Sequence, residues 1–391
     1  MKINRSTLVI YSMLLFTLGT SCTETDSFDI PLVSIDVSKA KVCYLEDIAK
    51  NIECYNLELP TDYYFGEIVD ILPHQDSLLL FHDYYTKQIH LFNAQGKYIN
   101  HLNRQGRGPG EYLDIEAFTT NQTTNQLTVY DHLGQKLVTY ALPDFKFVKQ
   151  QRIPKSLMAL TALSEDVFFT VSDEDEGMQS TVCDGAAFYN AKKNEFITCD
   201  IPNDYITVNL SYPRTLSYTD QKYYYACPYE YSTLYELNEK EATPILNFHF
   251  GNKNMPKKLW QNNDALAFEE IVEDNAYALM PQYFLKQDSI CSFFFFNGSP
   301  QHSCMAISPM RANATPKVIE QIKLKGIKTL IEIKPLGVLN NKYVCLLYPY
   351  QCKIDKEAIL ESPVSQMIYE KLQQTQDEGT PILLLFQPKF N

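Results

Sequence analysis

The stretch Lys87–Tyr112, KQIHLFNAQGKYINHLNRQGRGPGEY, decides how the rest of this 391-residue chain is interpreted. It predicts a strand, a tight turn, a second strand and then a glycine-rich loop, GRGPGEY, at Gly106–Tyr112. Glycines permit positive φ and proline fixes one φ, so such a loop is typical of a sharp turn between β units.

The same unit recurs at a fixed interval. LLLFHDYYTKQIHLFN begins at Leu78, and LTVYDHLGQKLVTYA begins at Leu127. Asp83 aligns with Asp131 (131 − 83 = 48), and Phe92 aligns with Tyr140 (140 − 92 = 48). Each copy combines an apolar strand, a polar turn led by aspartate, and an alternating strand. An interval near 48 residues with four strands per unit is typical of a propeller blade.

More degenerate copies follow along the chain. They are Val167–Val171 with Ala187–Asn190, Lys222–Ala226 with Thr233–Asn238, Ile290–Phe296 with Ser303–Ile307, and Lys342–Leu347. We therefore expect an all-β, six-bladed β-propeller of four-stranded blades over residues 45–391. Two helical insertions are predicted, at Pro256–Met280 and at Asp355–Gln376, the second with a break at Pro363.

The two chain ends supply the strands for closing the ring. An N-terminal strand at Ile52–Leu59 and the C-terminal strand Pro381–Phe386 (PILLLF) are expected to share the last blade. Closure satisfies edge N–H and C=O groups that would otherwise invite aggregation.

The first residues read as a targeting signal. Lys2 and Arg5 precede the apolar run Leu8–Leu18, which has the length of a signal-peptide core and is too short to span a bilayer. Gly19, Thr20 and Ser21 then lead into Cys22, in an arrangement that resembles a relaxed bacterial lipobox. We expect residues 1–21 to be a lipoprotein signal peptide, Cys22 to carry the lipid, and residues 22–44 to form a tether. An ordinary secretory peptide with a chance cysteine is the alternative.

The composition limits the kinds of partner and cofactor that we expect. The net charge of −13 makes nucleic acid an unsuitable partner, because phosphate binding needs basic patches. Nine cysteines remain besides Cys22, without CxxC or zinc-ribbon spacing. They are interpreted mainly as core thiols, with one or two disulfides as the alternative. The seven histidines include no HExxH motif, and no metal or other cofactor is predicted.

The chain resembles the six-bladed β-propeller lipoproteins of Bacteroidota, distant relatives of NHL-type and TolB-type propellers. GKYINHLNRQGRGPGEY carries the resemblance, with Phe65–Ile68 (FGEI), TLYEL and PILLLF in support. The resemblance implies a place in the cell envelope, at the outer membrane, and a role in binding a glycan, peptide or envelope protein. It implies no catalytic residue.

Candidate ligand contacts are few. Arg107, Glu111 and Tyr112 could meet a ligand at the propeller mouth, although a purely structural turn, with Arg107 and Glu111 paired across it, also explains this loop. Tyr84-Tyr85 and Tyr229–Tyr231 are further aromatic candidates. We expect a non-catalytic binding or scaffold module whose ligand lies over the central channel. The alternative is a lactonase-like or lyase-like propeller enzyme with a metal in that channel, which would need acids, amides or histidines from at least three blades.

Overall fold

The computed structural model describes residues 30–60, 63, 65–172, 185–201, 215–227, 233–256, 277–375 and 377–389. Residues Pro31–Asn391 form one compact unit. The predicted signal peptide, Cys22, Tyr229–Tyr231 and residues 257–276 of the first predicted helical insertion lie outside the described residues. None of the helices in the described ranges has the length and hydropathy that a membrane span requires.

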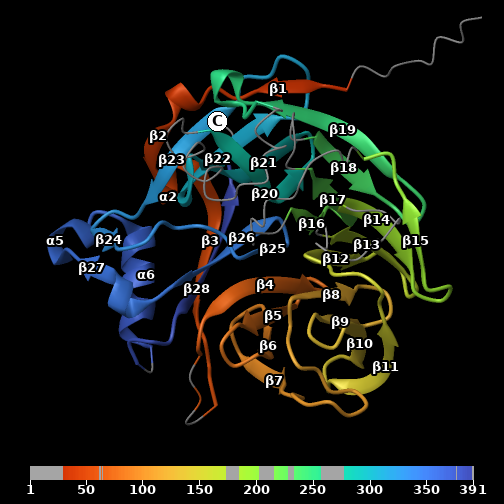
Figure 1. Ribbon diagram of the computed structural model, residues 1–391. Coiled ribbons are helices and arrows are strands. Elements are labelled where there is room, and N and C mark those ends of the chain that lie inside the picture. The colour runs from red at the N-terminus through yellow and green to blue at the C-terminus, as the bar shows by residue number, and fades with distance from the viewer. Residues whose placement is uncertain are drawn as a thin grey trace, which may run out of the picture. The chain divides into compact units, whose positions relative to one another are not determined.

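The compact unit is a six-bladed β-propeller, as the repeats predicted, and Figure 1 shows its sheets arranged in a ring. The first three blades have four antiparallel strands each. Blade 1 contains β4 (Ile68–His74), β5 (Leu78–Asp83), β6 (Gln88–Asn93) and β7 (Tyr98–Leu102). Blade 2 contains β8 (Ala117–Asn121), β9 (Gln126–Asp131), β10 (Lys136–Ala141) and β11 (Lys146–Arg152). Blade 3 contains β12 (Ala159–Ala162), β13 (Val167–Ser172), β14 (Gly185–Asn190) and β15 (Glu195–Thr198).

The later blades keep this plan and add to it. Blade 4 contains β16 (Leu216–Thr219), β17 (Lys222–Ala226), β18 (Thr233–Leu237) and β19 (Ala242–His249). Blade 5 contains β20 (Ala278–Gln287), β21 (Ile290–Asn297), β22 (Ser299–Pro309) and β23 (Lys317–Lys323). Blade 6 contains β25 (Gly337–Leu339), β26 (Lys342–Leu347), β28 (Ile382–Pro388) and β3 (Ala49–Asn56).

The ring closes through the two chain ends, as expected. β28 pairs antiparallel with β3, and Leu384 lies opposite Cys54. The first strands of successive blades contact one another, and β25 of blade 6 meets β4 of blade 1. Here the Ile71 N–H donates to the Leu336 carbonyl oxygen at 2.9 Å. A Cβ on neighbouring Gly337 would lie 2.2 Å from the Ile71 carbonyl oxygen, so this junction requires glycine.

Two short strands precede β3 and extend the outer edges of two blades. β1 (Leu32–Ser34) pairs in parallel with β19 of blade 4, and β2 (Lys41–Tyr44) pairs in parallel with β23 of blade 5. A 3-10 turn (η1, Val37–Lys39) and a helical turn (α2, Leu45–Ile48) connect them to each other and to β3. Part of the segment expected to be a tether, from residue 32 onward, is therefore integrated into the propeller. These two blades have five strands instead of the four predicted.

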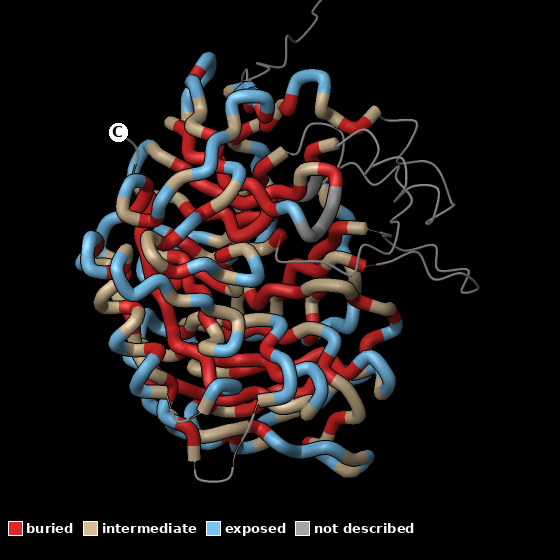
Figure 2. Tube along the Cα trace, turned by 90° about the vertical axis from the view of Figure 1, so that its left-hand side faces the viewer, coloured by how far each residue is buried: buried red, intermediate tan, exposed pale blue. Residues whose placement is uncertain are grey.

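Burial follows the position of a strand within its blade. Second strands such as β5, β9 and β26 are buried along nearly their whole length, whereas the outer strand β11 alternates between exposed and half-buried residues. Adjacent sheets pack face to face, so strands flanked by two blades bury both sides. Figure 2 shows the resulting buried interior beneath an exposed outer layer.

The second predicted helical insertion is present between β26 and β28. It contains η3 (Pro349–Gln351), β27 (Cys352–Ile354), α5 (Lys356–Ile359) and α6 (Pro363–Gln373), and β27 pairs with β24 (Ile327–Thr329). α6 begins at Pro363, where Ser362 caps the helix by accepting the Ser365 N–H. Ile368 and Leu372 bury one face of this helix. A further 3-10 turn, η2 (Gly251–Lys253), follows β19.

Several cysteines pack as core residues. Cys54, Cys291, Cys304 and Cys345 are free thiols at most 6% exposed. Burial raises the pKa of the Cys291 thiol to about 12, so the thiolate is suppressed at neutral pH.

Candidate functional site

The central channel is narrow and lined by uncharged residues. Its volume is about 60 Å³, and residues from the first strands of all six blades surround it. The polar lining consists of hydroxyl groups and the amide of Gln122, and the described lining residues include no carboxylate, imidazole or thiol. Small-molecule sites usually enclose roughly 300–1,000 Å³. The convergent acids or histidines that a channel metal would need are not found among these lining residues.

The candidate site residues lie instead at one end of the blades, which we call the upper face. In blades 1 and 2 the loop entering the first strand, the turn between the second and third strands, and the end of the fourth strand all meet at this end. The opposite end, which carries the turns around Gln95 and Asp144, is called the lower face.

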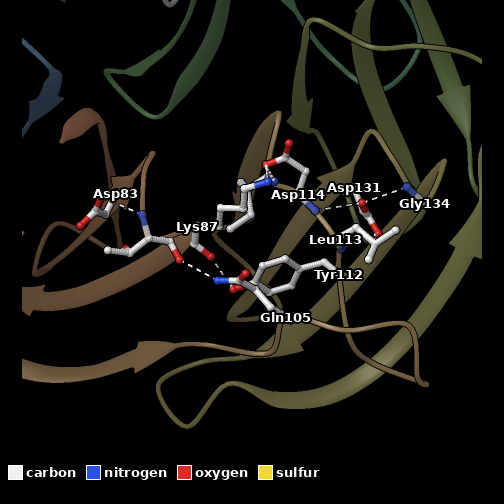
Figure 3. A network of polar contacts seen from close by, with 10 residues as sticks. Asp83, Lys87, Gln105, Tyr112, Leu113, Asp114, Asp131 and Gly134 are labelled. Carbon is white, nitrogen blue, oxygen red and sulfur yellow. Dashed lines mark hydrogen bonds and ion pairs between the residues drawn. The ribbon is translucent and has the colours of Figure 1, made fainter. Parts of the chain in front are cut away.

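The repeated aspartates organise the upper face of these two blades. The Asp131 carboxylate is fully buried and accepts the N–H groups of Leu113 at 3.1 Å, Asp114 at 3.2 Å and Gly134 at 3.0 Å (Figure 3). Asp83, also fully buried, accepts three N–H groups from equivalent positions, those of Gly66, Glu67 and Thr86. Each aspartate thus caps the turn that it leads and also fastens the loop that enters its blade.

The glycine-rich loop is held by Glu111 from within. The Glu111 carboxylate accepts the Gly108 N–H at 2.7 Å, and a Cβ at Gly106 would lie 2.1 Å from it. Gly110 has a φ of +71° and lies against the ring of Phe147. Arg107 is exposed and makes no ion pair with any described residue, so the pairing of Arg107 with Glu111 is not seen. Backbone geometry therefore explains the glycines, as the structural interpretation of this loop predicted.

Tyr112 lies inside the protein. Its side chain is fully buried, and its hydroxyl donates to the carbonyl oxygens of Lys87 at 2.8 Å and Leu102 at 3.3 Å. Burial raises the pKa of the Tyr112 phenol. In this position Tyr112 joins blade 1 to the loop and cannot touch a ligand from solvent (Figure 3).

An open groove lies beside this loop on blade 2. It has a volume of about 470 Å³. Its lining residues are Gly106, Arg107, Leu113, Asp131, Leu133, Gly134, Lys136, Gln150, Gln151 and Arg152. The lining includes the ends of β10 and β11, so the groove is displaced from the propeller axis. The groove therefore does not coincide with the position over the channel where we expected a ligand.

The register of blade 2 brings the basic side chains together. Lys136 lies directly opposite Arg152 in the pairing of β10 with β11. The Lys136 ammonium donates to the Glu111 carbonyl oxygen at 2.7 Å and lies 3.8 Å from the Asp131 carboxylate, so it also supports the loop. Sequence reasoning missed Lys136 and Arg152, because nothing local in the sequence relates them to Arg107.

Exposed aromatic residues lie on the upper face of blade 1. Tyr84 and Tyr85 in the β5–β6 turn are 56% and 71% exposed, and their rings meet edge-on with centroids 5.6 Å apart. The adjacent Thr86 carbonyl oxygen accepts the Gln105 side-chain N–H at 2.7 Å, which ties this turn to the glycine-rich loop (Figure 3). Tyr84 and Tyr85 therefore lie on the upper face, as accessible as the sequence analysis suggested.

The histidines of blade 1 are packed among aromatic rings. His90 is fully buried, and the Tyr63 hydroxyl lies 2.6 Å from its Nε2 atom. The His101 ring stacks on His90 with centroids 5.8 Å apart. Burial lowers the pKa of His90 to about 4, so its imidazole is neutral at pH 7. Across the described residues, no three histidine, cysteine or acidic side chains converge as a metal site would require.

The protein is therefore a propeller with a narrow central channel and an open groove with a polar lining on its upper face. The chain belongs to the DUF4934 family, a domain of unknown function that matches residues 29–387. Its structure is similar to that of a "Putative exported protein" from Bacteroides fragilis NCTC 9343, with a TM-score of 0.70 and 15% identity. That similarity covers 92% of this chain and 100% of the other.

A second structural relative has a more distant sequence. It is a member of the DUF4221 family from Bacteroides vulgatus, with a TM-score of 0.51, 10% identity, and coverage of 88% of this chain and 98% of that one. No curated protein matches this chain. At these identities the two structures support the shared fold alone.

Proposed function

We propose that this protein is a non-catalytic binding module of the cell envelope that holds its ligand or protein partner on the upper face of blades 1 and 2. The observation that carries the proposal is the contrast between the groove of about 470 Å³ at the upper face and the channel of about 60 Å³. Concave sites with a few polar groups are the usual places for ligands, and exposed tyrosines supply contact area with little loss of conformational entropy.

We further propose that Cys22 anchors the protein in the outer membrane through attached acyl chains. The lipobox-like residues before Cys22 support this location, and so does the fold shared with a Bacteroides fragilis protein described as exported. Several acyl chains make membrane binding stable, whereas a single chain binds only marginally. Kinship with NHL-type and TolB-type propellers stays a prediction from the sequence.

Metabolic labelling with a palmitate analogue tests the anchor. Wild-type protein should take up label and sediment with outer membranes, and a Cys22→Ala variant should do neither. Equal labelling of both forms would contradict the lipid assignment.

Capture from cross-linked envelope extracts tests the binding role. The immobilised propeller should retain a ligand or protein that a Tyr84→Ser/Tyr85→Ser variant retains much less. The matched control is Gln95→Ala/Asp144→Ala, which changes two exposed turn residues on the lower face of the same blades. The proposal fails if no species is retained above a blank resin, or if the lower-face variant loses it while the upper-face variant does not.

A further inference from the structure

The groove on blade 2 is positively charged within a strongly acidic protein. Arg107, Lys136 and Arg152 line it, and Asp131 is its one acidic lining residue. Three positive charges and one negative charge give a local balance of +2. The whole chain has a net charge of −13. The charge of the groove thus has the opposite sign to the net charge of the whole chain.

The single acid cannot neutralise the two arginines. Both oxygens of the Asp131 carboxylate accept backbone N–H groups, and Lys136 is the cation closest to it, at 3.8 Å. Arg107 and Arg152 are exposed, and neither forms an ion pair with any described residue. Two guanidinium groups therefore face the same groove with their donors available to a ligand.

The remaining polar lining also favours an acceptor-rich ligand. The Gln150 side-chain oxygen accepts the Gly110 N–H at 3.0 Å, which leaves its amide N–H groups without an acceptor among the described residues. Guanidinium groups present N–H donors in a planar fork that matches the oxygens of carboxylate, phosphate or sulfate. Leu133, 61% exposed at the rim, offers an apolar contact beside these donors.

We propose that the groove binds an oxyanion group of the ligand, a carboxylate, phosphate or sulfate, between Arg107 and Arg152. This inference rests on the proposed binding function and specifies the chemistry of its ligand. Arg107 extends from the glycine-rich loop and Arg152 ends β11, so the loop geometry set by Glu111 and Asp131 positions one of the two arginines. Gln150 donates a further hydrogen bond to the same group.

Calorimetric titration at low ionic strength tests the proposal. The probes are inorganic phosphate, inorganic sulfate and glucuronate, with uncharged glucose as the comparison. At least one anion should bind wild-type protein, glucose should not, and added sodium chloride should weaken the binding. An Arg107→Gln/Arg152→Gln variant should bind that anion at least about tenfold more weakly, because charge-assisted hydrogen bonds are lost. Both arginines are exposed, so unchanged thermal unfolding will show that the variant is folded.

Lys149→Gln provides the matched control. Lys149 lies on β11 as Arg152 does, but it is paired with Asp166 at 3.2 Å and is absent from the groove lining. Its loss should change the affinity less than twofold. Binding of phosphate or sulfate alone would indicate a tetrahedral anion, and binding of glucuronate a carboxylate.

The proposal is overturned if no anion binds wild-type protein, or if the double arginine variant binds as well as the wild type. These results are separable from the capture experiment. Retention of a partner without anion binding would reject the oxyanion inference alone. Anion binding without any retained partner would reject the broader binding role while leaving the groove assignment in place.

Discussion

Replacing Asp131 should destabilise the propeller by a predictable amount, because this carboxylate is fully buried and accepts three backbone N–H groups. A hydrogen bond to a charged group contributes about 1.5–3 kcal/mol, so three would sum to roughly 5–9 kcal/mol if they were independent. They share one side chain and are not additive, and water can enter the vacated space. We expect Asp131→Ala to lower the free energy of unfolding by about 4 kcal/mol.

The asparagine variant separates the contributions of the two Asp131 carboxylate oxygens. In Asp131→Asn one oxygen can still accept from Asp114 and Gly134, but an amide N–H₂ would face the Leu113 N–H. We therefore expect a loss of about 2 kcal/mol for this variant. Thermal unfolding followed by circular dichroism should show a fall in Tm of roughly 5 °C for the alanine variant and about half of that for asparagine.

Two comparisons make this prediction specific. Asp83→Asn should behave like Asp131→Asn, because Asp83 accepts the N–H groups of Gly66, Glu67 and Thr86 in the equivalent arrangement. Asp144→Ala, at an exposed turn, should change stability by less than about 0.5 kcal/mol. Replacing a carboxylate that is kept for function often makes a protein more stable. A rise in Tm for Asp131→Asn, or no change, would therefore refute the structural role assigned here.

Three further predictions follow from buried groups. Burial lowers the pKa of both His82 and His90 to about 4, from 6.5 in the unfolded chain, so their contribution to the free energy of unfolding is fully present above pH 6.5 and is lost as the pH falls towards 4. At pH 5 the loss should be about 2 kcal/mol per histidine, and urea unfolding of His90→Phe should depend less steeply on pH than that of the wild type. The buried thiol of Cys291 should resist iodoacetamide at pH 8 until the protein is unfolded, which mass spectrometry can follow, and rapid native alkylation would contradict its burial. Leu384→Ala, in the closing strand β28, should cost about 3 kcal/mol in denaturant unfolding, and a loss below 1 kcal/mol would argue against a tightly packed closing blade.

The sequence predicted those parts of the fold that repeat locally. The 48-residue offset places Asp83 and Asp131 at the same position of two hairpins, and the structure gives them the same hydrogen bonds. The apolar strands at the two chain ends predicted ring closure, because a propeller needs a partner for each edge.

The sequence did not predict the features that depend on pairing between distant segments. β1 and β2 are short segments whose parallel partners lie more than 200 residues later in the chain. Their local sequence pattern therefore does not indicate that they form strands. The groove likewise depends on the β10–β11 register, which places Arg152 opposite Lys136 and beside the loop that carries Arg107. Tyr112 was proposed as a contact because it ends a distinctive motif, yet its hydroxyl is needed inside the protein.

Site-specific photocrosslinking in living cells tests most directly whether the upper face of blades 1 and 2 is the binding surface. A benzophenone side chain is introduced at Tyr85 or Leu133 on the upper face, and at Gln95 or Asp144 on the lower face. All four positions are exposed. After irradiation, crosslinked products of higher mass should form from Tyr85 and Leu133 and not from the lower-face positions. Crosslinks confined to Gln95 and Asp144 would contradict the account.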